Sequence, residues 1–143
     1  MKVETATPTN VMRPIGPYSH IAKAGSFIAI SGTAGVDPAS GELAGPDVVA
    51  QTRQILRSLE RMLASAGSDL GHVLHVNVFL KRVEDFDAMN GAYREAFAGL
   101  PLPARTVVAV ADLPRPGALL TMNLTAVVAD PSDAPFIGPG PNT

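Results

Sequence analysis

Two segments of the chain place apolar residues at helical spacing. Within Val48–Ala66 these residues recur three and four positions apart over about five turns. Asp47 precedes this range as a suitable N-cap, and Gly67 follows it as a suitable stop. A second helical pattern starts near Glu84 and is ended by Gly99. The pattern therefore predicts two helices.

Strand patterns surround both helices. Alternating or short apolar runs predict strands over residues 26–31, 73–80, 105–111 and 118–128, with weaker strands over 3–7 and 21–23. Because each helix lies between strands, two crossover connections are required. We therefore expect an α+β fold in which both helices pack on one face of a mixed sheet.

The other face of that sheet is expected to be half polar. In residues 73–80 the alternation assigns Leu74 to the helix-covered face together with Val76. The opposite face receives His75, Asn77, Thr121, Asn123 and Thr125, but also the apolar Phe79 and Val127. Such a mixed face is not a sealed core, and burial against other subunits would resolve the conflict.

Length and composition fit one folded domain. The chain has 143 residues, of which 46% are apolar and 17% charged, and a chain of this size supports one core. We expect a single domain over residues 1–129. Residues 130–143 contain four prolines and two glycines, which predicts a C-terminal tail.

Residue usage narrows the possible functions. A net charge of −2 gives no general attraction to nucleic acid or to an anionic membrane, and no apolar run approaches the ~18 residues of a membrane span. The absence of cysteine excludes disulfides, thiolate catalysis and cysteine–zinc sites, and it is compatible with a reducing cytoplasm. His72 and His75 point apart at a strand start, so no metal site is expected.

Arg105 is the most informative single residue. It is the only charge in the apolar and small segment 100–110. A guanidinium stays charged when buried and needs an anionic partner. A small carboxylate ligand, bound bidentately, is one such partner. An ion pair with Asp47, Asp69 or a neighbouring subunit is the other, and the pattern leaves both open.

Three further features of the sequence are candidates for a functional role. Tyr18 follows a rigid Gly-Pro turn and is either a packed loop residue or a site hydroxyl. Ser31 and Gly32 end an apolar strand where the backbone permits close approach, although the glycines of a nucleophile elbow are missing. Three arginines four residues apart form a stripe on the first predicted helix, namely Arg53, Arg57 and Arg61. This stripe is either a solvated helix face or an RNA contact.

A series of short motifs runs from Ile15 to Val128. They are Ile15-Gly16-Pro17-Tyr18-Ser19, Ile30-Ser31-Gly32, Asp37-Pro38, Gly41-Glu42-Leu43, Gln51-Thr52-Arg53-Gln54, Val78-Phe79-Leu80, Phe86 to Asn90, Pro103-Ala104-Arg105 and Leu113-Pro114. In this order and spacing the chain resembles the RidA/YjgF family of reactive intermediate imine deaminases, whose older label is endoribonuclease L-PSP or translation inhibitor.

The resemblance implies a chorismate-mutase-like homotrimer with ligand clefts between its subunits. Active members hydrolyse imines or enamines of the 2-aminoacrylate or 2-iminobutanoate type to 2-oxo acids and ammonia, with neither cofactor nor metal. It therefore implies a cytoplasmic enzyme whose partner is a small carboxylate-bearing substrate. The implied catalytic residues are Arg105, Tyr18 and Thr121, and the implied substrate-binding residues are Ser31, Gly32, Asn90 and Val107.

Departures from the family pattern widen the choice of function. The family Glu that orients water falls on Thr121, or on Asn123 if the last strand is shifted, and neither is a carboxylate. Thr33 stands for a Gln, and Val107 for a frequent Cys whose backbone carbonyl acts. The alternatives are a deaminase for another enamine such as 2-aminomuconate, a non-catalytic binder of small carboxylates, and an RNA-directed translation inhibitor, which the charge and scarce aromatics support poorly.

Overall fold

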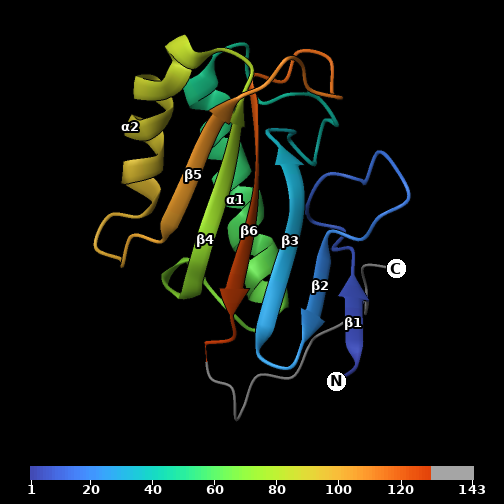
Figure 1. The fold of residues 1–143 in the computed structure, drawn as a ribbon. Helices are drawn as coiled ribbons and strands as arrows, with labels where there is room; N and C mark the ends of the chain where they lie inside the picture. Colours follow the sequence, from blue (N-terminus) through green and yellow to red (C-terminus); the bar gives the residue numbers. More distant parts are fainter. Residues whose placement is uncertain (130–143) are drawn as a thin grey trace.

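A six-stranded mixed sheet, covered on one face by two helices, makes up the computed structural model, which describes residues 1–129 (Figure 1). The strands are β1 (Val3–Ala6), β2 (Ile21–Ala24), β3 (Phe27–Ala34), β4 (Val73–Leu80), β5 (Ala104–Ala109) and β6 (Leu120–Val127). Their order is β1-β2-β3-β6-β4-β5, and every neighbouring pair is antiparallel except the parallel β4 and β5. The predicted α+β fold is confirmed, whereas the predicted tail lies outside the described residues.

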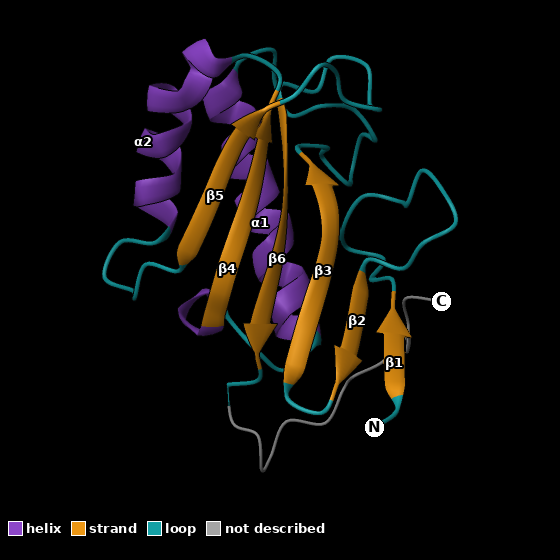
Figure 2. Ribbon diagram, viewed as in Figure 1, coloured by secondary structure: helices purple, strands orange, loops and turns teal. Residues whose placement is uncertain are grey.

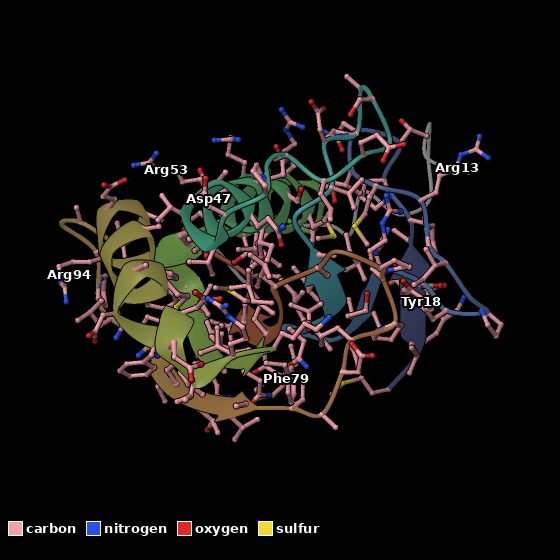
Figure 3. All side chains as sticks on the ribbon, turned by 90° about the horizontal axis from the view of Figure 1, so that it is seen from above. Arg13, Tyr18, Asp47, Arg53, Phe79 and Arg94 are labelled. Atoms are coloured by element: carbon pink, nitrogen blue, oxygen red, sulfur yellow. The ribbon has the colours of Figure 1, made fainter. Side chains whose placement is uncertain are left out.

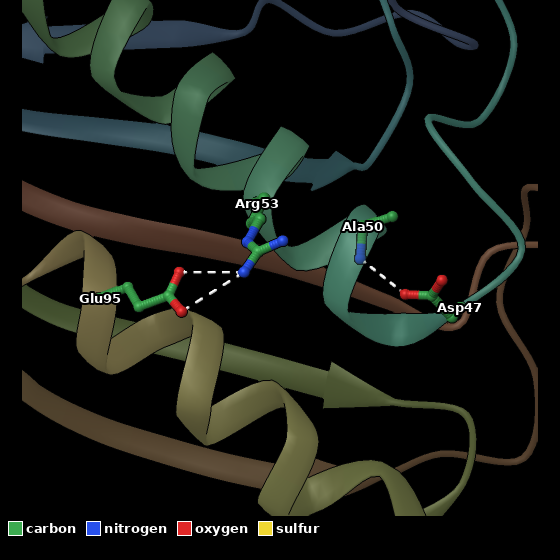
Figure 4. A network of polar contacts seen from close by, with 4 residues as sticks. All are labelled: Asp47, Ala50, Arg53 and Glu95. Carbon is green, nitrogen blue, oxygen red and sulfur yellow. Dashed lines mark hydrogen bonds and ion pairs between the residues drawn. The ribbon is translucent and has the colours of Figure 1, made fainter.

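Helices α1 (Val48–Ser65) and α2 (Phe86–Ala96) lie behind the sheet (Figure 2). A strand follows each helix along the chain. Two short 3-10 helices, η1 (Leu70–His72) and η2 (Val83–Asp85), lie in the connections. Asp47 caps α1 as predicted, because its carboxylate accepts a hydrogen bond of 2.8 Å from the Ala50 N–H. An exposed ion pair of 3.3 Å joins Arg53 of α1 to Glu95 of α2 (Figure 4).

The core lies between α1 and the helix-covered face of the sheet. Side chains of α1 with no exposed surface meet equally buried residues of the central strands β4 and β6. They are Ile55, Leu59, Met62 and Leu63 from the helix, and Val76, Val78, Leu120 and Met122 from the strands. Apolar and polar residues thus alternate along β4 and β6 because one face of these strands packs on the core and the other face is open.

The open face is half polar, as predicted. The Asn77 side-chain amide donates to Asn123 Oδ1 at 2.9 Å, and His75 Nε2 lies 3.1 Å from Thr106 Oγ1. The Phe79 side chain points away from α1 (Figure 3). The placement of Leu74 on the helix-covered face was wrong, because the pairing of β4 with β6 shifts after Val73 and leaves Leu74 45% exposed.

Strand β3 also runs further than the predicted end at Ser31. Its pairing with β6 shifts between Ile30 and Thr33 and then resumes to Ala34. The intervening Ser31 and Gly32 therefore form a bulge, a feature that re-aims side chains next to functional sites. The Ser31 N–H donates to the His20 carbonyl at 3.0 Å, which ties this bulge to the start of β2.

A buried glutamine joins α1 to two loops. Gln51 has no exposed surface, and its Nε2 donates to the carbonyls of Gly45 at 3.0 Å and Gly117 at 3.2 Å. Its Oε1 accepts from the Leu119 N–H at 2.8 Å. Gly35, at the end of β3, lies so close that a Cβ there would be 2.6 Å from the Gln51 carbonyl oxygen. This packing holds the loops at Gly45 and Gly117 against the start of α1.

Candidate active site

A cavity of about 870 Å³ lies where the loop between β1 and β2 meets the bulge of β3. Four of the predicted site residues line it, namely Tyr18, Ser31, Gly32 and Thr121. A Cβ built on Gly32 meets no atom within 4 Å, so the backbone is open toward the cavity. The structure therefore brings these four residues, from three separate chain segments, to one wall.

His20, which the sequence did not single out, lies directly beneath Ser31. Its ring is fully buried, with Nε2 2.5 Å from the Met12 carbonyl oxygen and Nδ1 3.4 Å from Ser31 Oγ. Because a carbonyl only accepts, Nε2 carries the proton and Nδ1 accepts from the Ser31 hydroxyl. The Tyr18 ring packs edge-on against this imidazole at 5.9 Å between centroids.

Burial lowers the pKa of His20 from its ordinary 6.5, although the hydrogen bond to Met12 opposes that change. The imidazole therefore stays neutral at pH 7. This keeps its acceptor nitrogen available to Ser31, whose lone pairs are then directed toward the cavity rather than toward the protein.

The stability of the fold is expected to depend on pH through His20. Above pH 6.5 the imidazole is neutral in both the folded and the unfolded chain. Below that value the unfolded chain takes up a proton that the folded chain resists, so the free energy of unfolding should decrease as the pH falls. Urea unfolding between pH 5 and 8 should show that acid lowers the free energy of unfolding of His20→Gln less than that of the wild type. Identical slopes in wild type and His20→Gln would contradict this.

Arg105 lies at the other edge of the sheet and faces α2. Its guanidinium carbon is 4.7 Å from the Tyr93 ring centroid and 5.9 Å from that of Phe86. Within residues 1–129 no hydrogen bond or ion pair satisfies it. The two intramolecular partners considered are engaged elsewhere, since Asp47 caps α1 and Asp69 Oδ1 lies 2.7 Å from His72 Nδ1.

Two buried polar atoms without partners lie on the face of α2 that contacts this guanidinium. Asn90 Oδ1 and the Tyr93 hydroxyl have no hydrogen-bond partner among the described residues. Burial raises the pKa of Tyr93 to about 12, although the positive charge of Arg105 opposes the rise. The Arg105 guanidinium and the neutral Tyr93 phenol could thus both donate to a ligand carboxylate, whereas Asn90 Oδ1 could accept from a ligand N–H.

Val107 belongs to the same half of the site. It pairs with Val78 as Arg105 pairs with Val76, so both β5 residues face the helices. It lines a smaller hollow of about 440 Å³ together with Phe86 of α2. This hollow contains none of the residues of the larger cavity.

The predicted site is therefore divided within one chain. Strands β3 and β5 are separated by β6 and β4, a distance of about 14 Å. Thr121 pairs with Phe79 on the open face, whereas Arg105 pairs with Val76 on the helix-covered face. One small molecule therefore cannot touch both residues of a single copy.

The other candidate residues have partners within the chain. The stripe on α1 is engaged within the chain: Arg53 with Glu95, Arg57 with the Gln54 side chain, and Arg61 with the Asn10 carbonyl. His72 and His75 contact different residues, as their spacing predicted. In residues 1–129 there is no group of three His, Asp or Glu that could hold a metal, and no helix there is long and apolar enough to cross a membrane.

Comparisons with known proteins agree with this architecture. The profile of the family described as Endoribonuclease L-PSP matches residues 8–128. A RutC family protein of Pyrococcus horikoshii is 44% identical over 106 residues, which cover 74% of this chain and 83% of that protein. The 2-iminobutanoate/2-iminopropanoate deaminase of Mus musculus is 40% identical over 107 residues, covering 75% of this chain and 78% of the relative.

Solved structures show the same fold. The YjgF gene product of E. coli is 33% identical, with a TM-score of 0.82 over 87% of this chain and 98% of that one. E. coli TdcF, solved with bound serine, is 29% identical, with a TM-score of 0.83 over 88% and 99% of the two chains. The chain therefore belongs to the Endoribonuclease L-PSP family, the RidA/YjgF family that its motifs resemble.

Proposed function

We propose that this protein is a homotrimeric deaminase of small imine or enamine acids of the 2-aminoacrylate or 2-iminobutanoate type. Water adds to the carbon of the C=N bond, and the C–N bond then breaks to release a 2-oxo acid and ammonia. The names of the mouse and goat relatives support this reaction. The proposal places the enzyme in the cytoplasm, with which the cysteine-free composition is compatible.

The observation that carries the proposal is the unsatisfied guanidinium of Arg105. Its guanidinium carbon lies over the rings of Tyr93 and Phe86, while its N–H groups have no acceptor within residues 1–129. A substrate carboxylate would bind this fork bidentately. Asn90 Oδ1, which has no partner among the described residues, would accept from the N–H of the adjacent imine or iminium.

The cavity lined by Tyr18, Ser31 and Thr121 would supply the reacting centre of the composite site. Ser31 Oγ, whose proton is directed to His20, is free to accept from an iminium N–H. The Thr121 hydroxyl would orient the attacking water. An iminium is already electrophilic, so positioning of water contributes much of the rate.

The divided site and the open sheet face both support the trimer. Large apolar side chains on or beside that face remain exposed in one chain, including Phe27 at 61% and Val108 at 43%. Subunits that meet there would cover them and bring Arg105 of one copy toward Ser31 of the next. Light scattering should give the mass of three chains, and a monomer would exclude the proposal.

A second candidate function is non-catalytic binding of small carboxylates. It is favoured by Thr121, a residue that cannot take up a proton near neutral pH, at the position where the family resemblance expects Glu. The serine found in E. coli TdcF is itself a small amino acid with a carboxylate. Calorimetry with 2-oxobutanoate that shows binding, combined with no catalysed imine decay, would favour this second function.

The change Thr121→Glu is expected to raise kcat severalfold. It supplies a general base beside the water, and such a base contributes roughly 10²- to 10⁴-fold where it is fully positioned. Asn123→Glu is the matched variant, because Asn123 is already bonded to Asn77 on the same face. A rise in KM alone would mean that the new carboxylate blocks the site, and a gain only in Asn123→Glu would assign the water to residue 123.

The decisive assay couples an amino-acid oxidase or threonine dehydratase to this protein and follows decay of the imine. We expect the imine to disappear faster than in buffer, with formation of the 2-oxo acid at the same accelerated rate. Imine decay at the uncatalysed rate over a wide range of protein concentration would exclude the deaminase function.

A further inference from the structure

We infer that the preferred substrate of this site is a dicarboxylic imine or enamine acid, whose second carboxylate binds Arg115 with Arg13 at the rim. This rests on the proposed function and adds the substrate class to it. The inference starts from the wall of the 870 Å³ cavity, which contains two arginines and no acidic side chain. Neither arginine belongs to the site that the family resemblance implies.

Arg115 lines the same cavity as the bulge of β3 and is held in place by a hydrogen bond. Its Nη2 donates to the Gly41 carbonyl at 2.9 Å, which fixes the guanidinium against the loop that closes the cavity. The carboxylate of Glu42 is 3.9 Å away but is 81% exposed, so it screens the charge only weakly. The guanidinium has five N–H donors, most of which remain available to a ligand.

Arg13 stands on the same side of the molecule as Tyr18 and extends outward from the loop between β1 and β2 (Figure 3). Within residues 1–129 no ion pair or hydrogen bond neutralises its charge. Its position at the rim favours attraction of an anion into the cavity rather than a fixed contact.

The size of the cavity also supports a substrate with two carboxylates. Cavities of roughly 300–1,000 Å³ hold ligands of drug size, so 870 Å³ exceeds what a three-carbon imino acid fills. In the composite site the first carboxylate is taken by Arg105 of a neighbouring copy. A second cationic anchor in the same space therefore fits a substrate with a carboxylate at each end.

The test compares two imines made in the same way. An oxidase for acidic amino acids acting on glutamate supplies 2-iminoglutarate, and a general amino-acid oxidase supplies 2-iminobutanoate. We expect kcat/KM for 2-iminoglutarate to be at least about tenfold higher, because only the longer substrate has a second carboxylate that can bind Arg115. Arg115→Gln should remove this preference, so that the ratio of kcat/KM for 2-iminoglutarate to that for 2-iminobutanoate falls by about tenfold.

Two variants and one binding measurement make the outcome unambiguous. Arg115→Lys keeps the charge without the bidentate fork and should retain part of the preference. Arg94→Gln, an exposed arginine on the far side of the molecule, should change neither rate (Figure 3). Calorimetry should show 2-oxoglutarate binding more tightly than 2-oxobutanoate in wild type but not in Arg115→Gln.

The binding arm separates this inference from the proposed function. If neither imine decays faster than in buffer, yet 2-oxoglutarate binds in an Arg115-dependent manner, the deaminase proposal fails and the dicarboxylate site stands. If both imines are hydrolysed equally well and Arg115→Gln affects both alike, the deaminase stands and this inference is overturned. Equal binding of the two oxo acids would overturn it as well.

Discussion

Replacing Arg105 by glutamine should lower kcat/KM for imine hydrolysis by about 10²- to 10³-fold, since removing one partner of a buried charged pair costs roughly 2–5 kcal/mol. The guanidinium has no anionic partner in residues 1–129 and is stacked on Tyr93. Glutamine keeps a polar side chain of shorter reach but has neither the charge nor the fork. The measurement is the initial rate of imine decay over a range of substrate concentrations.

Two controls accompany this experiment. Arg105→Lys retains the charge but loses the bidentate geometry, so it should fall between wild type and Arg105→Gln. A thermal melt of each variant checks the fold, because loss of the cation–π contact with Tyr93 and Phe86 costs about 0.5–2 kcal/mol. Wild-type kinetics in a folded Arg105→Gln would remove the basis of the proposed function.

Replacing Gln51 by leucine should reduce the free energy of unfolding by about 3–5 kcal/mol, since each buried polar group left unsatisfied costs roughly 1–3 kcal/mol. The side chains are similar in size, but leucine cannot bond to the backbone groups of Gly45, Gly117 and Leu119. Urea unfolding at one fixed protein concentration measures the change, because association itself adds to apparent stability.

A second glutamine of the same helix provides the control. Gln54 is also buried, but its side chain bonds only within α1, to Ser58 Oγ and Arg57 Nη2. Gln54→Leu leaves no backbone group without a partner and should cost at most about 1 kcal/mol. Equal losses for the two variants would show that Gln51 acts through packing and not through its bridging hydrogen bonds.

The sequence predicted an element correctly where its hydrophobic pattern depends on burial of one face alone. The bounds of β4 were predicted as observed, because its residues face an apolar core on one side and an open surface on the other. The ends of α1 were predictable because they depend on local chemistry. Asp47 caps the first turn, and Gly67 follows the last turn with a positive φ of 80°. The errors at Leu74 and at the end of β3 both lie at register shifts, which depend on the neighbouring strand and leave no mark in local periodicity.

The candidate site was predictable only in part, and for a similar reason. Arg105 is conspicuous as a lone charge, whereas the pairing of His20 with Ser31 depends on the register between β2 and β3. Arg115 reaches the cavity through a connection between distant segments, since its guanidinium bonds to Gly41. A pattern shows which residues share an element's face but not which elements meet, so contacts across loops had to come from the structure.

The placement of Arg105 and Ser31 on separate halves of the chain has a genetic consequence. Under the proposed assembly, each reaction site belongs to a pair of subunits and not to one polypeptide. Two inactive versions of the chain, one lacking Arg105 and one lacking the cavity wall, would complement each other when they assemble together, because about one interface in four would join two intact halves. By the same arithmetic, a copy that lacks both halves would disable two of the three sites of a trimer, whereas a copy that lacks only one half would disable one.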